Sequence, residues 1–227
     1  MTIEPTEAPE ADDPLRRQLA FARVLNELAE VIIASEDPQS LLERMAALVG
    51  AALGADRALI YRAELSIGRA VGLCEWLDPR DEGITSAFGT YPIDMFRGGI
   101  AEMLRTRSWI ESHTDAVHPA FVADGSAHTL HVDMAVRSLL WYPFGFHADG
   151  FHALIINQVA RRRAWRPDEI AFLSAASRQV GLALDKLSLI AERSRAETEL
   201  RAHDMRYRAL YDGTPSMLFT VDAHGVV

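Results

Sequence analysis

Two neighbouring segments rich in large apolar residues constrain the fold more than any other feature of the chain. They cover residues 138–146 and 151–159, and Leu, Ile, Phe, Trp and Tyr dominate both. Ala148-Asp149-Gly150 stands between them, and such a tripeptide is typical of a tight turn. The pattern therefore predicts an antiparallel hairpin. Pro143 has no N–H to donate, which predicts a bulge or an edge position in the first strand.

Amphipathic helical patterns lie on both sides of this hairpin. Apolar residues recur every three to four positions over residues 15–33 and again over 41–53. Asp37 is suited to capping the second of these helices and Gly54 to ending it. A further helix is expected to begin at Pro167 and to run long, because no later proline interrupts the pattern until the last part of the chain.

The middle of the chain combines short strands with irregular structure. Residues 57–65 and 70–77 are β-prone and predict a pair of neighbouring strands. Residues 78–89 are dense in Asp, Pro, Gly and Ser, which favours a loop. Residues 91–136 are expected to hold a brief strand, short helices and irregular segments.

Composition and charge narrow the possible functions. The 227 residues carry a formal net charge of −9, which works against nucleic-acid binding. The basic run Arg161-Arg162-Arg163 is interpreted as a solvated connection between a strand and a helix. No apolar stretch is long enough to span a membrane, so we expect a cytoplasmic protein with no membrane span in this region. The single cysteine, Cys74, excludes an internal disulfide framework.

Three short stretches resemble conserved segments of the GAF domain family. They read SEDPQSLLE at residues 35–43, VRSLLWYPF at 136–144 and WRPDEI at 165–170. The similarity extends over roughly residues 20–187 and agrees with the order of the predicted elements. It implies an α/β (α+β) fold with a central antiparallel sheet. The N- and C-terminal helices would pack on one face, and loops and short helices would form a roof over the other.

Four regions follow from this interpretation. Residues 1–14 are expected to be a disordered tail, 15–187 a GAF-like sensory domain, and 188–212 a signalling helix. The sequence from Arg206 onward resembles the first helix and strand of a PAS domain, so residues 213–227 are predicted to be a truncated PAS start. Proteins with this order resemble bacterial sensor histidine kinases or cyclic-dinucleotide enzymes, which implies a downstream output domain, such as the histidine kinase of a two-component system.

Known ligand chemistries of the resembled family find little support in the residues. Cyclic-nucleotide-binding members carry an Asn-Lys pair, whereas here Gln158 follows Asn157. Pigment-binding members attach a bilin through a cysteine in motifs that Cys74 lacks. Members that reduce methionine sulfoxide need several cysteines, and the chain has no compelling catalytic set, so no enzyme activity and no catalytic residue are predicted.

A small apolar pocket is the remaining possibility for a ligand, and its ligand or cofactor stays unknown. The residues predicted to line it combine apolar and a few polar side chains. They are Cys74, Trp76, Phe121, His128, His131, Met134, Leu140 and Tyr142. Two alternatives remain open: a degenerate domain that acts only as a structural dimerisation module, and a haem- or metal-binding sensor.

Four histidines motivate the second alternative. His113, His118, His128 and His131 fall within nineteen residues, and imidazole is a common ligand of zinc and haem iron. No adjacent cysteine and no reliably placed carboxylate completes a tetrahedral set, so the favoured interpretation places the histidines in solvated loops and predicts no metal site.

The flanking helices predict a homodimer. Their apolar stripes would pair in a parallel dimer built as a four-helix bundle about a two-fold axis. The predicted interface consists of Leu15, Leu19, Ala22, Val180, Leu184, Leu187 and Ala191.

Overall fold

The computed structural model describes residues 14–212. Contacts between residues divide the chain into two units, and the boundary along the chain lies between Asp185 and Lys186. In the second unit, residues 186–212 continue the helix α6 (Pro167–Asp212), and almost all of the side chains described there are exposed. The predictions of a disordered tail and of a PAS start fall on residues outside the described range.

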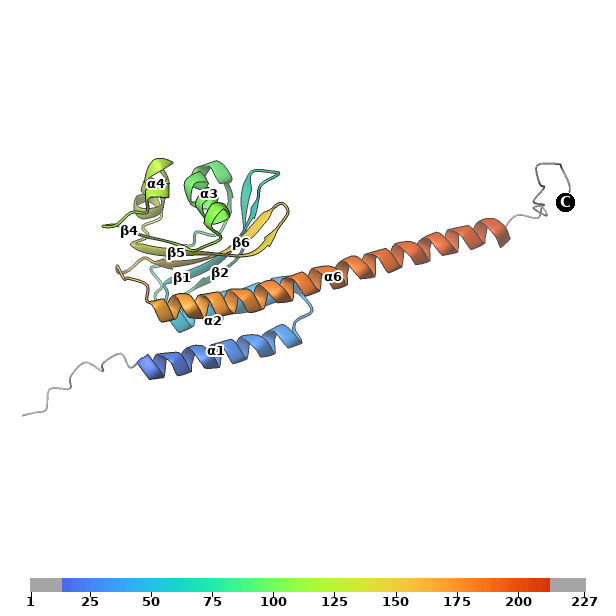
Figure 1. The fold of residues 1–227 in the computed structure, drawn as a ribbon, viewed down its shortest axis with the longest axis horizontal. Coiled ribbons are helices and arrows are strands. Elements are labelled where there is room, and N and C mark those ends of the chain that lie inside the picture. Colours follow the sequence, from blue (N-terminus) through green and yellow to red (C-terminus); the bar gives the residue numbers. More distant parts are fainter. Residues whose placement is uncertain (1–13, 213–227) are drawn as a thin grey trace, which may run out of the picture. The chain divides into compact units, whose positions relative to one another are not determined.

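A six-stranded antiparallel sheet forms the centre of the first unit (Figure 1). Its order is β3-β2-β1-β6-β5-β4, so the hairpin of β5 and β6 lies beside the hairpin of β1 and β2. The strands are β1 (Arg57–Glu64), β2 (Arg69–Leu77), β3 (Thr90–Pro92), β4 (Ile110–His113), β5 (Ser138–His147) and β6 (Gly150–Gln158). The predicted central antiparallel sheet is therefore confirmed, including both hairpins.

Pro143 sits where β5 has a partner on one side only. It pairs with Ala153 of β6, whereas β4 covers β5 just from Ser138 to Trp141. The predicted edge position is thus correct, and the irregularity in the β5–β6 register comes later, between Phe144 and His147. The missing N–H of the proline therefore leaves no ladder position on the β4 side unsatisfied.

Helices cover one face of the sheet. They are α2 (Pro38–Leu53) and the part of α6 up to Asp185, and Figure 1 shows α1 (Pro14–Ala34) on the outer side of these two helices, away from the sheet. The predicted caps of α2 are present, because the Asp37 carboxylate accepts hydrogen bonds from two backbone N–H groups and Gly54 adopts a left-handed conformation with φ of 56°. Glycine is suited to this conformation because it lacks a Cβ.

Specific contacts hold this helical layer together. The rings of Phe21 on α1 and Phe172 on α6 stack with centroids 4.4 Å apart. Arg17 of α1 donates to the Asp168 carboxylate in the first turn of α6 at 2.7 Å. On α2, a Cβ added at Gly50 would lie 2.3 Å from the Trp76 ring, so the absence of a side chain lets β2 approach the helix.

Short elements cover the opposite face as a roof (Figure 1). They are the 3₁₀ turn η1 (Ile93–Phe96), α3 (Arg97–Thr106), α4 (Pro119–Ala123), α5 (Ser126–His128) and the π-helical turn η2 (Thr129–Asp133). The close approach of α3 to α4 depends on Gly98, because a Cβ there would lie 2.1 Å from the carbonyl oxygen of Ala120.

Candidate functional site

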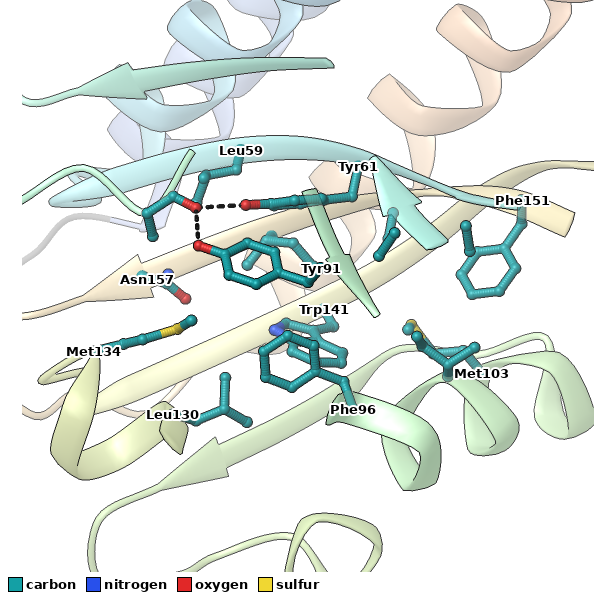
Figure 2. A pocket seen from close by; sticks show the side chains of 16 residues that line it. Leu59, Tyr61, Tyr91, Phe96, Met103, Leu130, Met134, Trp141, Phe151 and Asn157 are labelled. Carbon is teal, nitrogen blue, oxygen red and sulfur yellow. Dashed lines mark hydrogen bonds between the residues drawn. The ribbon is translucent and has the colours of Figure 1, made fainter. Parts of the chain in front are cut away.

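A cavity of about 70 Å³ lies between the sheet and the roof (Figure 2). Its walls come from the strands β1, β2, β3, β5 and β6 on one side and from η1, α3 and η2 on the other. The lining residues are Leu59, Tyr61, Ala63, Ala70, Ala87, Tyr91, Phe96, Ile100, Met103, Leu130, Met134, Trp141, Phe151, Ala153, Ile155 and Asn157. None of these side chains is acidic, basic or a histidine.

Strand register determines which residues reach the cavity. Successive side chains of a strand point to opposite faces, so β1 contributes every second residue and β6 does the same from Phe151 to Asn157. Trp141 of β5 pairs with Ile155 of β6, which places the indole on the cavity side. The intervening residues pack toward the helices, so side chains on both faces of the sheet belong to the core of the unit.

Two tyrosines form the most polar part of the wall. The hydroxyl groups of Tyr61 and Tyr91 both donate to the carbonyl oxygen of Ala87, at 2.5 and 2.9 Å, as the dashed lines in Figure 2 mark. Burial raises the pKa of Tyr61 well above its usual value, so this phenol stays neutral. Since each hydroxyl proton is already used, the two oxygens offer only acceptor lone pairs to a ligand.

Trp141 supplies an unused donor. Its Nε1 is buried and has no hydrogen-bond acceptor among the described residues. In Figure 2 the indole nitrogen lies on the side of Trp141 that faces Met134 and Asn157. Buried indole N–H groups usually have a hydrogen-bond partner, so the unpaired N–H of Trp141 is an exception to this rule.

A buried arginine sits behind the cavity wall. With its side-chain oxygen turned toward Arg57, Asn157 accepts from Nη2 and Nε at 3.0 and 3.2 Å. Arg57 also donates to the carbonyl oxygen of Thr85 at 2.7 Å, and burial lowers the pKa of its guanidinium. The guanidinium is thus engaged by two neutral oxygens, one from Asn157 in the cavity lining and one from Thr85 outside it, and Arg57 itself is not among the lining residues.

The sequence prediction of the pocket assigned several strand residues to the wrong face. Cys74, Trp76, Leu140 and Tyr142 lie away from the cavity, and Trp76 packs against α2. The reason is the two-residue period of a strand: Leu140 and Tyr142 flank Trp141, and therefore point to the helical side. The prediction that these four residues line the pocket is wrong for this cavity.

The predicted pocket residues of the roof lie in different surroundings, and not all of them line the cavity. Met134 lines the cavity. Phe121 is fully buried and packs edge-on against Trp141, with ring centroids 4.8 Å apart, but lies behind the cavity lining. The ring nitrogens of His131 are hydrogen-bonded to the Ser112 hydroxyl and to the carbonyl oxygen of Val136, at 2.8 and 2.6 Å. His128 is exposed and lies beside a surface aspartate.

The four histidines do not converge. Within residues 14–212, no three His, Cys, Asp or Glu side chains are grouped so that they could hold a metal ion. The expectation of solvated loops is wrong for His113, which is buried in β4 and hydrogen-bonded through Nδ1 to the Ser138 hydroxyl at 2.9 Å. Burial lowers the pKa of this imidazole. His118 caps α4 instead, because its Nδ1 accepts from the N–H of Ala120.

The predicted interface residues fall into three groups. Leu15, Leu19, Ala22 and Ala191 are exposed, and Leu184 and Leu187 are partly buried. Val180 has no exposed surface because it packs within its own chain, so it is not available to a second copy, and its assignment to the interface is wrong. Leu182 and Leu189 on α6 are 66% and 65% exposed and were missed.

Most cavity residues were missed for one reason. Tyr61, Tyr91, Phe96 and Ile155 lie on four different elements, and no local pattern brings them together. The alternation of side chains along a strand could have found some of them. If Trp141 faces the roof, its partner Ile155 and every second residue of β6 also face the roof.

The sequence and the fold match known proteins. The sequence model of the GAF domain family matches residues 37–184. A putative methyl-accepting chemotaxis protein of Synechocystis sp. is 26% identical over 196 residues, which are 83% of this chain. The chain spans 18% of the length of that relative.

Two solved structures illustrate the similarity of fold. The phycocyanobilin-bound GAF domain of a cyanobacterial phytochrome has a TM-score of 0.63 and 19% identity, covering 74% of this chain and 96% of that domain. The free methionine-R-sulfoxide reductase of Neisseria meningitidis, solved with its substrate, has a TM-score of 0.59 and 16% identity, covering 82% and 98%.

Proposed function

The chain belongs to the GAF domain family, and from this premise we propose that it is the sensory module of a signalling protein, with a small-molecule site in the cavity between sheet and roof. Binding there would change the packing of α1, α2 and α6 on the opposite face. The observation that carries the proposal is the cavity itself, which combines apolar walls with a few polar groups, as small-molecule sites do.

The sheet provides a physical connection between the cavity and the helices. Ile155 of β6 faces the cavity, whereas its neighbours Leu154 and Ile156 are fully buried toward the helical side. Packed interiors have little free space, so a ligand that displaces Ile155 must also shift the residues beside it. Phe21 and Phe172 stack within the helical layer, and such a shift would change the contact between their rings.

A regulatory role fits the chemistry better than a catalytic one. Cys74 is the single cysteine of the chain, and it is buried on the helical side of β2. Burial raises the pKa of its thiol to about 12, so it carries almost no thiolate at neutral pH. A thiol in this state is a poor nucleophile for the sulfoxide reduction that the Neisseria meningitidis relative is named for, or for covalent attachment of a bilin.

The relative from Synechocystis supports a place in signal transduction, because its name is that of a chemotaxis protein. A downstream PAS domain and an output domain, such as a histidine kinase, remain part of the proposal for the whole protein. Within residues 14–212, none of the helices combines the length and the apolar character required to cross a membrane.

A homodimer would carry the signal between copies. We place its interface on exposed apolar side chains, with Leu19 on α1 and Leu182 on α6 as central residues of the first unit and with Leu189 farther along α6 in the second unit. Leu182 and Leu189 are seven positions apart and therefore share one face of the helix. Exposed leucines on helices otherwise rich in charge are suited to burial against a second copy.

The cavity can be tested by filling it. Ala153→Leu adds a larger side chain to the cavity wall, and Ala51→Leu makes the same change at an exposed position of α2 as a control. A library of uncharged single-ring compounds, screened by thermal shift, should contain compounds that stabilise the unmodified protein and the Ala51→Leu variant but not Ala153→Leu. If no compound distinguishes the variants while the dimer persists in light scattering, the chain is a structural dimerisation module instead.

A further inference from the structure

We propose that the cavity selects an uncharged ring compound that carries a hydrogen-bond acceptor, and that Trp141 Nε1 donates to this acceptor. The inference rests on the proposed ligand-binding role of the cavity and specifies the chemical class of the ligand. Four observations carry it: the absence of charge in the lining, the unused indole donor, the occupied tyrosine hydroxyls, and the size and shape of the space.

The absence of charge argues against an ionic ligand. Two charged groups behind the cavity wall compensate each other and are hydrogen-bonded to the protein. Arg57 donates to Thr85 and Asn157, the Glu75 carboxylate accepts from the Ser86 hydroxyl and the N–H of Ala87, and the charge of Glu75 acts on Arg57. An ion in the cavity would lose its hydration without gaining a counter-charge, which is far more costly than burying a neutral molecule of the same size.

The unused donor requires an acceptor on the ligand. Nε1 of Trp141 is the indole's single donor, and it is buried without a partner among the described residues. The hydroxyl protons of Tyr61 and Tyr91 already bond to Ala87, so they do not compete for the acceptor of the ligand. A ligand with an acceptor would satisfy the indole, whereas a purely hydrocarbon ligand would leave it unpaired.

The size of the space limits the ligand to about one ring. The cavity of about 70 Å³ is roughly half of the 150 Å³ that accommodates benzene in an engineered apolar cavity. Met103 and Met134 in the wall have flexible thioether chains that can make additional room. The rings of Phe96 and Trp141 meet edge to face at 5.7 Å, an arrangement into which a further aromatic ring packs well.

Three ring compounds of nearly the same shape test the proposal. Pyridine has an acceptor nitrogen, benzene has none, and N-methylpyridinium carries a permanent charge in place of the lone pair. Dissociation constants measured by ligand-observed NMR at neutral pH should show pyridine binding about three- to tenfold more tightly than benzene, because it satisfies a buried donor. N-methylpyridinium should not bind measurably.

A pair of tryptophan variants isolates the donor. Trp141→Phe keeps an aromatic ring and removes the N–H, so pyridine should lose its advantage and bind no more tightly than benzene, because its nitrogen then gives up hydration without gaining a hydrogen bond. Trp76→Phe makes the same change on the helical side of the sheet and should keep the preference of the unmodified protein for pyridine. If Trp141→Phe does not fold, the indole N–H resonance of Trp141 in the unmodified protein provides the readout, since pyridine but not benzene should shift it downfield.

The outcomes separate this inference from the proposed function. Equal affinities for pyridine and benzene, tighter binding of N-methylpyridinium, or a preference for pyridine that survives Trp141→Phe would overturn the assignment of the acceptor and leave the cavity as a ligand site. A different result would overturn the proposed function itself: the unmodified protein binds none of the three compounds, and no compound of the thermal-shift screen distinguishes it from Ala153→Leu.

Discussion

His152 of β6 should make the stability of this protein fall between neutral and mildly acidic pH. Its imidazole is largely buried on the helical side of the sheet, where it stacks on Phe144 with ring centroids 5.4 Å apart, and its Nδ1 has no partner among the described residues. Burial lowers the pKa of His152 from 6.5 to about 4. The native state therefore holds this side chain neutral at pH values where the unfolded chain binds a proton.

The sign and the size of the effect follow from this difference. Because the unfolded state binds more protons between pH 6.5 and about 4, the free energy of unfolding rises with pH in this window and is lost as the pH falls. A pKa of 6.5 in the unfolded chain and about 4 in the native state gives a loss of about 2–3 kcal/mol between roughly pH 7.5 and pH 4.5.

Urea denaturation at a series of pH values measures this contribution. His152→Phe keeps the stacked ring and removes the titrating group, so its stability should fall by about 2–3 kcal/mol less than that of the unmodified protein over this pH range. His203→Phe removes an exposed histidine of α6 and serves as the control. If the curves of the unmodified protein and His152→Phe run parallel to within about 0.5 kcal/mol, His152 is not held neutral by burial and the reasoning is refuted.

Three further changes test the fold and the proposed dimer. His113→Ala should destabilise the protein by about 1–3 kcal/mol in urea denaturation, because it removes a buried hydrogen bond of β4, whereas a change under about 0.5 kcal/mol would restore the interpretation as a solvated loop residue. Leu182→Glu combined with Leu189→Glu should yield a folded monomer at roughly 50 μM in light scattering, and an unchanged mass, or a monomer already in the unmodified protein, would contradict the proposed interface. Gly98→Ala should cost about 1–3 kcal/mol because its Cβ would collide with the carbonyl of Ala120, and a melting temperature equal to that of the unmodified protein would show that α4 is not held where we describe it.

Local sequence signals predicted most of the elements. Asp37 and Gly54 mark the ends of α2 because capping and the left-handed conformation depend on single residues and their immediate neighbours. The turn at residues 148–150 and its apolar flanks predicted the β5–β6 hairpin, which pairs over short sequence distance. These features are local in the chain, and the tertiary structure has not overridden them.

The candidate site depended on non-local facts. Which face of β5 meets the roof is decided by the pairing of Ser138 with Gln158 and by the position of α3 and η2, and neither is encoded in the strand itself. A change of one residue in this assignment exchanges Trp141 for Leu140 or Tyr142, and that exchange is the error of the sequence prediction. The buried position of His113 has the same origin, because β4 becomes covered only when it pairs with β5.

The sequence by itself determined the order of the elements, the ends of α2 and the family to which residues 37–184 belong. Only the tertiary structure decided which side chains form the cavity, that Trp141 keeps an unpaired donor beside it, and that Val180 is buried within its own chain. The physical reason is the range of the interactions involved. Caps and turns are set within about four residues along the chain, whereas burial depends on residues that meet only after the sheet, the helices and the roof have packed together.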